Sequence, residues 1–304
     1  MDQQLLVFVT ATDLKSFSRA AEQLYMTQPA VSQHVQSLER RLGVPLMERN
    51  NKRIRLTKAG EIVYAHGRDI LHLYHQMQRY VDDLANREIG NLSIGASYTF
   101  GEYVLPRVIA HFCERYPAII PTVAITNTRE IVARVADGDL DVGVIEGQHD
   151  NDRVDTIPIA TDTVVMVAAA AHPLAAHRTG VVPASAAGAS LWIVRETGSG
   201  TREVTQRAFA TCGITPSALL EFGSTQAVKE AVEAGLGLSV LSRWAIRKEL
   251  ALGTLRTIHM EGMPITRSFS LVLRKSRFHT KAAELFSDLL QSEPPHLPPE
   301  EPGS

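Results

Sequence analysis

Three short segments of the chain combine hydroxyl side chains with glycine, and each follows a run of apolar residues. They are Ser97-Tyr98-Thr99-Phe100-Gly101, Gly198-Ser199-Gly200-Thr201-Arg202 and Gly223-Ser224-Thr225-Gln226. A helical pattern follows each segment, so we predict three strand ends that lead into helix N-termini. Free N–H groups at a helix N-terminus, together with serine and threonine hydroxyls, bind small anions. The sequence therefore predicts a site for an oxyanion or a carboxylate.

Two charged residues complete this predicted site. Arg202 would supply a counter-charge if its side chain turned inward, and Glu146 would line the cleft or orient a donor. The alternative is that these serines and threonines only cap helices and that the glycines only mark turns. Three such segments on one fold favour a ligand site. The predicted ligand-contacting residues are Ser97, Tyr98, Thr99, Phe100, Glu146, Gly198, Ser199, Gly200, Thr201, Arg202, Thr225 and Gln226.

A second polar surface lies on one face of the helix predicted from Thr27 to Leu42. Glutamine both donates and accepts hydrogen bonds, as adenine does in the major groove. Within this helix, no carboxylate that would repel phosphate occurs before Glu39. This face suits base edges and phosphates, the alternative being a merely solvated surface. Its residues are Pro29, Ser32, Gln33, Gln36 and Arg40, and the inward-facing residues are Val31, Val35, Leu38 and Leu42.

The elements around this helix predict a winged helix-turn-helix. A first helix is expected over 2–12, and a short second one over 19–24 with Ser18 as its N-cap. Thr27 caps the third helix, and Pro29 sits in its first turn, where its missing N–H costs little. Residues 46–58 predict a two-stranded wing with a basic tip that includes Arg53. Up to Gly60 there are nine Lys/Arg and five Asp/Glu, which favours an anionic partner for this part of the chain.

A long helix is predicted from Lys58 to about Glu88. Its apolar residues follow a heptad spacing, so pairing with a second copy would bury them. The alternative is that they pack on the rest of the same chain. The predicted seam is Val63, His66, Ile70, Leu73, Met77, Tyr80 and Leu84.

Residues 90–293 alternate short apolar strands with helices, which predicts an α/β body with mainly parallel sheets. The expected elements include a strand over 163–168 and helices over 103–116 and 128–137. The proline-rich and acidic segment 294–304 is predicted to be a disordered tail. The start of the chain does not resemble a signal peptide, no apolar run is long enough to span a membrane, and Cys113 and Cys212 form no disulfide framework. These features favour the cytoplasm and argue against a membrane partner.

The N-terminal segment contains a dense set of motifs: Ser18-Arg19-Ala20-Ala21, Leu24, Thr27-Gln28-Pro29-Ala30-Val31-Ser32, Leu38-Glu39, Leu42-Gly43, Leu46 and Leu56-Thr57-Ala59-Gly60. With these motifs, the segment strongly resembles the DNA-binding domain of LysR-type transcriptional regulators. The resemblance implies a winged helix-turn-helix over 1–60, a linker helix over 58–89 and an effector domain over 90–293. It implies DNA contacts by Thr27, Gln28, Pro29, Ser32, Gln33, Gln36 and, at the wing, Arg53.

The same resemblance implies an effector domain built like a periplasmic solute-binding protein. Lobe I would comprise 92–162 and 267–293, lobe II would comprise 163–266, and two crossover strands would form the hinge. The implied partners are double-stranded promoter DNA, a small effector and further copies of the chain in a homodimer or homotetramer, with RNA polymerase as a further candidate. The segments GASYTFGEYVLP, GVIEG, RETGSGTRE and FGSTQAVKEAVEAGLGLSVLS resemble the branch that includes regulators of sulfur assimilation and sulfite response. That branch implies a sulfur oxyanion as effector, with a small carboxylate or another metabolite as the alternative.

Enzyme motifs are not matched. A dinucleotide-binding GxGxxG would need glycine at Glu203, and Ser199 lacks a GxSxG elbow. We therefore predict no catalytic residue, no metal site and no cofactor. An anion-processing enzyme and a transport-type solute-binding protein remain the alternatives, and ligand turnover and cell fractionation respectively distinguish them from a regulator.

Overall fold

The computed structural model describes residues 2–48, 54–85, 90–147, 149–176, 181–276 and 278–295. The chain forms two compact units, residues 1–82 and residues 83–304. Among the described residues, no helix has the length and apolar character needed to cross a membrane.

The N-terminal unit begins with three helices, α1 (Gln3–Asp13), α2 (Phe17–Gln23) and α3 (Gln28–Leu42). Thr27 caps α3 as predicted, and its hydroxyl accepts a hydrogen bond from the Ala30 N–H at 3.4 Å. The prediction for α2 was wrong by two residues, because Ser16 rather than Ser18 is the N-cap and accepts from the Arg19 N–H. Small alanines on α2 and the apolar face of α3 pack against α1 in one core.

Helix α3 buries Val31, Val35 and Leu38 as predicted, whereas Leu42 is 45% exposed. Leu42 is the last residue of the helix, before Gly43 in a left-handed conformation, so it lies beyond the packed core. Glu39 has a structural role, because its carboxylate accepts hydrogen bonds from the N–H groups of Leu46 and Met47 at 2.8 and 3.2 Å.

The predicted wing is present at its base as an antiparallel bridge between Met47 and Leu56. Two backbone hydrogen bonds, from Glu48 N to Arg55 O and from Thr57 N to Leu46 O, extend that pairing. The predicted basic tip with Arg53 falls within 49–53, outside the described residues.

Helix α4 (Lys58–Ala85) follows the wing, and Thr57 caps it by accepting the Gly60 N–H at 3.0 Å. Its first turns pack on the N-terminal core, where a Cβ on Gly67 would come within 2.9 Å of Val9. Further along the helix three residues of the predicted seam are exposed, Ile70, Leu73 (53%) and Met77. These three side chains are therefore not buried within the N-terminal unit itself.

The C-terminal unit holds a sheet in the order β2-β1-β3-β9-β4-β7, with β8 on β4, and a separate β5-β6 pair. Strands β1, β2 and β3 pair in parallel, as do β5 and β6, but every pairing made by β4 or β9 is antiparallel. The expectation of mainly parallel sheets thus holds only away from these two strands. The strands are β1 (Gly90–Ser97), β2 (Ile119–Thr126), β3 (Val142–Glu146), β4 (Val154–Ala169), β5 (Leu191–Arg195), β6 (Ala218–Phe222), β7 (Ser239–Ser242), β8 (Leu255–Thr257) and β9 (Ile265–Arg274).

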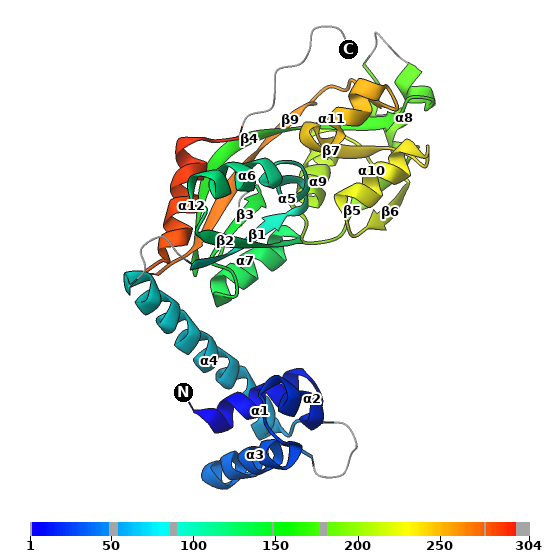
Figure 1. Ribbon diagram of the computed structural model, residues 1–304. Helices are drawn as coiled ribbons and strands as arrows, with labels where there is room; N and C mark the ends of the chain where they lie inside the picture. The colour runs from blue at the N-terminus through cyan, green and yellow to red at the C-terminus, as the bar shows by residue number, and fades with distance from the viewer. Residues whose placement is uncertain are drawn as a thin grey trace. The chain divides into compact units, whose positions relative to one another are not determined.

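Two lobes are built around this sheet, and β4 and β9 run through both of them (Figure 1). In lobe I, α5, α6 and α12 cover one face of the sheet and α7 covers the other. In lobe II, α9 packs on one side and α10 and α11 on the other. The helices are α5 (Tyr98–Tyr103), α6 (Leu105–Arg115), α7 (Thr128–Asp137), α8 (Ala184–Gly188), α9 (Gly200–Cys212), α10 (Thr225–Glu233), α11 (Arg243–Leu252) and α12 (Lys281–Ser292), with a 3-10 turn at Pro173–Ala176.

Candidate functional site

The three predicted segments do join strand ends to helix N-termini. Strand β1 ends at Ser97 and leads directly into α5, while the loop after β5 ends at Ser199, the N-cap of α9. The loop after β6 ends at Ser224, which caps α10 by accepting the Ala227 N–H at 3.1 Å. The helix cap expected of such serines is therefore real at Ser199 and Ser224, whereas Ser97 makes no side-chain cap bond.

Glu146, the last residue of β3, lies among the predicted donors and is only 1% exposed. Its carboxylate accepts the Thr99 N–H at 2.7 Å and the Thr201 hydroxyl at 2.7 Å. Arg267 of β9 forms an ion pair with the same carboxylate, with 2.7 Å between Nη1 and Oε2. The N-terminal donors of α5 and α9 are thus joined across the two lobes by the protein's own carboxylate.

Arg267 extends this buried group to Asp162 of β4, with 2.8 Å between Nε and Oδ2. Burial raises the pKa of Glu146, but Arg267 and the hydrogen bonds from Thr201 and Thr99 outweigh it, so the net pKa is lowered. For Asp162, burial is the largest effect and raises the pKa above its ordinary value, despite Arg267 and the Ser242 hydroxyl. Since Asp162 and Arg267 lie on the two crossover strands, the charge network sits where the lobes join.

The lobes approach each other closely at Gly200. A Cβ at this position would lie 2.5 Å from the Glu146 carbonyl oxygen and 3.1 Å from the Thr128 hydroxyl. Gly198 has a positive φ of 96°, and its carbonyl accepts the Arg129 N–H from lobe I at 3.2 Å. Both glycines are therefore needed for backbone contact between the lobes.

Two buried hydroxyls at this junction have no hydrogen-bond partner among the described residues, those of Ser97 and Thr128. Ser97 is 2% exposed and Thr128, the first residue of α7, is 1% exposed. Leaving a buried hydroxyl unpaired costs free energy, so such groups mark places where a ligand or water completes the bonding. Thr128 was missed in the sequence, although Asn127-Thr128 after a β-branched run has the same pattern as the predicted segments.

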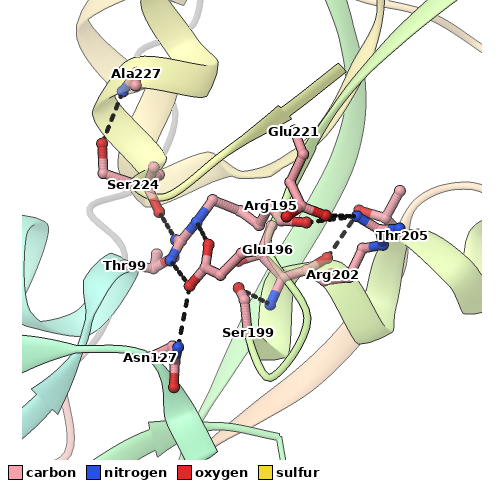
Figure 2. Close-up of polar contacts among 12 residues, drawn as sticks. Thr99, Asn127, Arg195, Glu196, Ser199, Arg202, Thr205, Glu221, Ser224 and Ala227 are labelled. Atoms are coloured by element: carbon pink, nitrogen blue, oxygen red, sulfur yellow. Dashed lines mark hydrogen bonds and ion pairs between the residues drawn. The ribbon is translucent and has the colours of Figure 1, made fainter. Parts of the chain in front are cut away.

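Arg195, the last residue of β5, is, like Arg267, a charged residue in contact with these segments that the sequence did not single out. Its side chain is 1% exposed and donates to both oxygens of Glu196 and to the Thr225 hydroxyl. The Tyr98 ring of lobe I lies beneath the guanidinium, 4.3 Å from Cζ to the ring centroid. Figure 2 shows Glu196 between Arg195 and Asn127. The only signal in the sequence was an arginine closing an apolar run, Leu-Trp-Ile-Val-Arg.

Three predicted residues do not join this group. Arg202 turns away, because its guanidinium donates to the Arg195 carbonyl and pairs with Glu221 at 3.0 Å (Figure 2). Phe100 lies in the lobe I core, edge-on to Phe269. Gln226 is exposed and bonds instead to Tyr103 and Glu230.

On the N-terminal unit, the predicted polar face of α3 is open. Thr27, Gln28, Pro29, Gln33 and Gln36 are exposed, and Ser32 is half-buried. A surface hollow is lined by α3 and the base of the wing, and its lining includes Gln33, Gln36, Arg40, Pro45, Met47 and Thr57. The glutamine amides therefore face open space rather than another part of this unit.

Comparisons with known proteins cover both units. Residues 3–61 match the family model described as "Bacterial regulatory helix-turn-helix protein, lysR family", and residues 85–295 match the "LysR substrate binding domain". The chain is 34% identical over 288 residues to the HTH-type transcriptional regulator CysL of Bacillus subtilis, covering 95% of this chain and 96% of CysL. It is 36% identical over 290 residues to a probable RuBisCO transcriptional regulator of Gracilaria tenuistipitata, covering 93% of each.

A solved structure resembles the C-terminal unit. It is the regulatory domain of CcmR from Synechocystis PCC6803 in complex with 2-PG, with a TM-score of 0.61 and 28% identity. The match covers 67% of this chain and 96% of that domain. The likeness therefore spans the whole two-lobed unit.

Proposed function

The chain belongs to the LysR family of transcriptional regulators, and we propose that a small anion bound between its two lobes controls how it binds promoter DNA. It is a DNA-binding regulator with an effector-binding domain, and its relatives are regulators rather than enzymes. The alternatives of an anion-processing enzyme and a transport-type binding protein are therefore set aside.

The anion proposal rests on the buried Arg195 guanidinium together with the unpaired buried hydroxyls of Ser97 and Thr128. The chain neighbours of these two residues, Tyr98 and Asn127, contact Arg195 and its partner Glu196 respectively. A buried guanidinium attracts a negative group with two oxygens, because its fork matches carboxylate and other oxyanions. Ser97 and Thr128 would then donate to the anion, and Tyr98 would contact it from lobe I. Thr99, Thr201 and Glu146 would hold the two helix N-termini in place around it.

Two classes of small anion are supported as the ligand. The sequence resemblance to sulfur-responsive regulators, which the match to CysL fits, supports a sulfur oxyanion such as sulfite or sulfate. The likeness to a domain that binds 2-PG and to RuBisCO regulators supports a small organic anion instead. Both classes present two or more oxygens on one centre, which is the feature that the Arg195 fork recognises.

For DNA, we propose that α3 enters the major groove, with Gln28, Gln33 and Gln36 near base edges and Thr27, Pro29 and Ser32 near bases or phosphates. Their exposure and the neutral, hydrogen-bonding character of the face support this assignment. Arg53 would contact phosphates or the minor groove from the wing.

We also propose that the exposed stripe of α4 pairs with a second copy, so that two N-terminal units meet two half-sites. A homotetramer built from such dimers and a contact with RNA polymerase remain further proposals. Because a regulator acts on promoter DNA, we propose that the protein works in the cytoplasm.

A thermal-shift screen tests the anion proposal. The full-length protein is scanned with sulfite, sulfate, thiosulfate, acetylserine, phosphate, 2-PG and small carboxylates. A ligand at 100 times its Kd stabilises the native state by about 2.7 kcal/mol, which raises the melting temperature by several degrees. Ser97→Ala with Thr128→Val should reduce that rise for the responding anion. An unchanged rise in the double variant would contradict the site.

A further inference from the structure

The edge of Arg195 that best binds an oxyanion is already occupied by the neighbouring residue. Nε donates to Oε2 of Glu196 at 2.7 Å, and Nη2 donates to Oε1 at 2.8 Å. Two parallel N–H···O bonds of this kind are the geometry in which arginine binds a free carboxylate, sulfite or phosphate. Glu196 therefore fills the position that an anionic ligand of Arg195 would take.

Other contacts hold the guanidinium in place without Glu196. Nη1 donates to the Thr225 hydroxyl at 2.8 Å, and the Tyr98 ring supports the face of the guanidinium. Arg195 is thus fixed at one end of β5 by two elements that do not depend on the carboxylate. If Glu196 moved away, the fork would remain in position and would require another anion, since a buried unpaired charge is costly.

Glu196 is held much less firmly than the arginine it binds. Its side chain is 23% exposed, and its further contact is a hydrogen bond from the Asn127 amide at 3.3 Å. Glu146 makes the useful comparison, because that carboxylate is 1% exposed and has three donors from Arg267, Thr99 and Thr201. The Glu196 carboxylate can rotate into solvent, whereas the Glu146 carboxylate could move only by breaking its bonds to all three donors.

We infer that Glu196 is an internal substitute for the effector. A small anion with two oxygens on one centre takes the Nε and Nη2 donors of Arg195, and Glu196 turns into solvent. This inference rests on the proposed function, since it names the anchor and the competitor of the same site. Because the competitor must leave first, the ligand binds more weakly than the open fork would allow.

The exchange also changes a contact between the lobes. Asn127 caps α7 in lobe I, and Glu196 belongs to lobe II. Displacing Glu196 from Arg195 breaks the hydrogen bond that the Asn127 side-chain amide donates to Glu196. The anion therefore favours an arrangement of the lobes that lacks this hydrogen bond. A ligand shifts an equilibrium only through such a difference between two states.

Removing the competitor tests the inference. Glu196→Gln keeps the size of the side chain but removes the negative charge that pairs with Arg195. Isothermal titration of the full-length wild type and the variant with sulfite, phosphate and 2-PG should show a Kd at least tenfold lower in the variant. Glu203→Gln, which removes the same charge from an exposed position in the first turn of α9, should change the Kd by less than twofold. Glu196→Asp keeps the charge but shortens its reach, so its affinity should fall between those of the wild type and Glu196→Gln.

Each result has one meaning. If the wild type binds an anion and Glu196→Gln binds it equally or more weakly, the competition is refuted while the proposed function stands. If Glu196→Gln fails to fold, Glu196→Asp decides in the same way, and an unchanged Kd refutes the inference. If neither the wild type nor a folded variant binds any of the three anions, both the inference and the proposed anion site fail.

Discussion

At the scale of single residues, two glutamates at the junction of the lobes differ in how deeply they are buried and how firmly they are bound. Glu146 is enclosed by Arg267, Thr99 and Thr201, whereas Glu196 is partly exposed and bound to Arg195. The buried acid with its donors holds the lobes together, and the exposed one occupies the ligand position. The predicted role of Glu146 as a residue that orients donors therefore agrees with its contacts, while Arg202 does not supply the counter-charge that was expected of it.

Glu146→Gln should destabilise the C-terminal unit by about 3 kcal/mol, because it removes one partner of a buried ion pair. The pKa of Glu146 is lowered in the folded state, so its contribution is complete above its ordinary value of 4.5 and is lost as the pH falls through the lowered value. Urea unfolding of the wild type and the variant should show a gap that is constant from pH 6 to 7 and narrows below about pH 4.5. A gap that widened in acid would contradict the assigned charge state.

Gln28→Ala should reduce affinity for the cognate promoter by roughly tenfold and leave random DNA little affected, because a lost base contact costs about 1–3 kcal/mol. Arg53→Ala provides the comparison, since a lost phosphate contact weakens all sequences alike and lowers the salt slope by about one. Fluorescence anisotropy on both duplexes over a range of salt concentrations measures these effects. Equal losses on cognate and random DNA for Gln28→Ala would remove it from base readout.

At the scale of elements, the sequence predicted the strand ends well and the hinge poorly. Thr128–Asp137 was predicted at its observed bounds, because a β-branched strand and glycine mark its two ends. Strand β4 begins at Val154 rather than Thr163, because its first half mixes polar and apolar residues around Pro158 and pairs along its length with the distant β9. The helix predicted over 103–116 corresponds to α6 (Leu105–Arg115), whereas α5 as a separate helix before it and α11 were not predicted.

The site was harder to predict than the elements because its partners lie far apart in the chain. Thr201 meets Glu146, 55 positions away, and Asn127 meets Glu196, 69 positions away. Residue type showed that hydroxyls follow the strands, but it could not show that the protein's own acids already bind some of them. It also could not separate Ser97, whose hydroxyl has no hydrogen-bond partner in the described part of the chain, from Ser199, whose hydroxyl caps a helix.

Gly200→Ala tests the close approach of the lobes. The added Cβ would press on the Glu146 backbone, so we expect a loss of about 1–3 kcal/mol in unfolding free energy and a weaker response to anions. Gly223→Ala is the matched control, because its Cβ would meet nothing within 4 Å. Denaturant unfolding and thermal shift measure the two variants side by side. Similar behaviour of both would mean that the lobes can separate at Gly200 without cost.

At the scale of the whole molecule, we propose that function requires a second copy of the chain. The exposed stripe of α4 combines large apolar side chains with a heptad spacing, which supports a second copy as its partner. The family resemblance predicted this pairing from the sequence. The geometry of the pair depends on contacts with the second copy, which the fold of a single chain does not specify.

Leu73→Asp should therefore shift the protein towards a monomer and weaken binding to a two-half-site promoter by at least tenfold. His75→Asp introduces the same charge at an exposed position on roughly the opposite face of α4 and should leave assembly unchanged. Sedimentation velocity gives the assembly state of each variant. An unchanged assembly in Leu73→Asp would remove the stripe from the interface.

The central claim is that anion binding between the lobes and promoter binding by α3 are thermodynamically coupled. The most direct measurement is the anion Kd of the full-length protein with and without saturating promoter duplex, by isothermal titration. Coupling of this kind is reciprocal and typically amounts to 5–150-fold, so we expect the Kd to differ by about fivefold or more. Arg195→Lys, which keeps the charge but loses the fork, should bind the anion more weakly in both states. An identical anion Kd with and without promoter DNA would contradict the account.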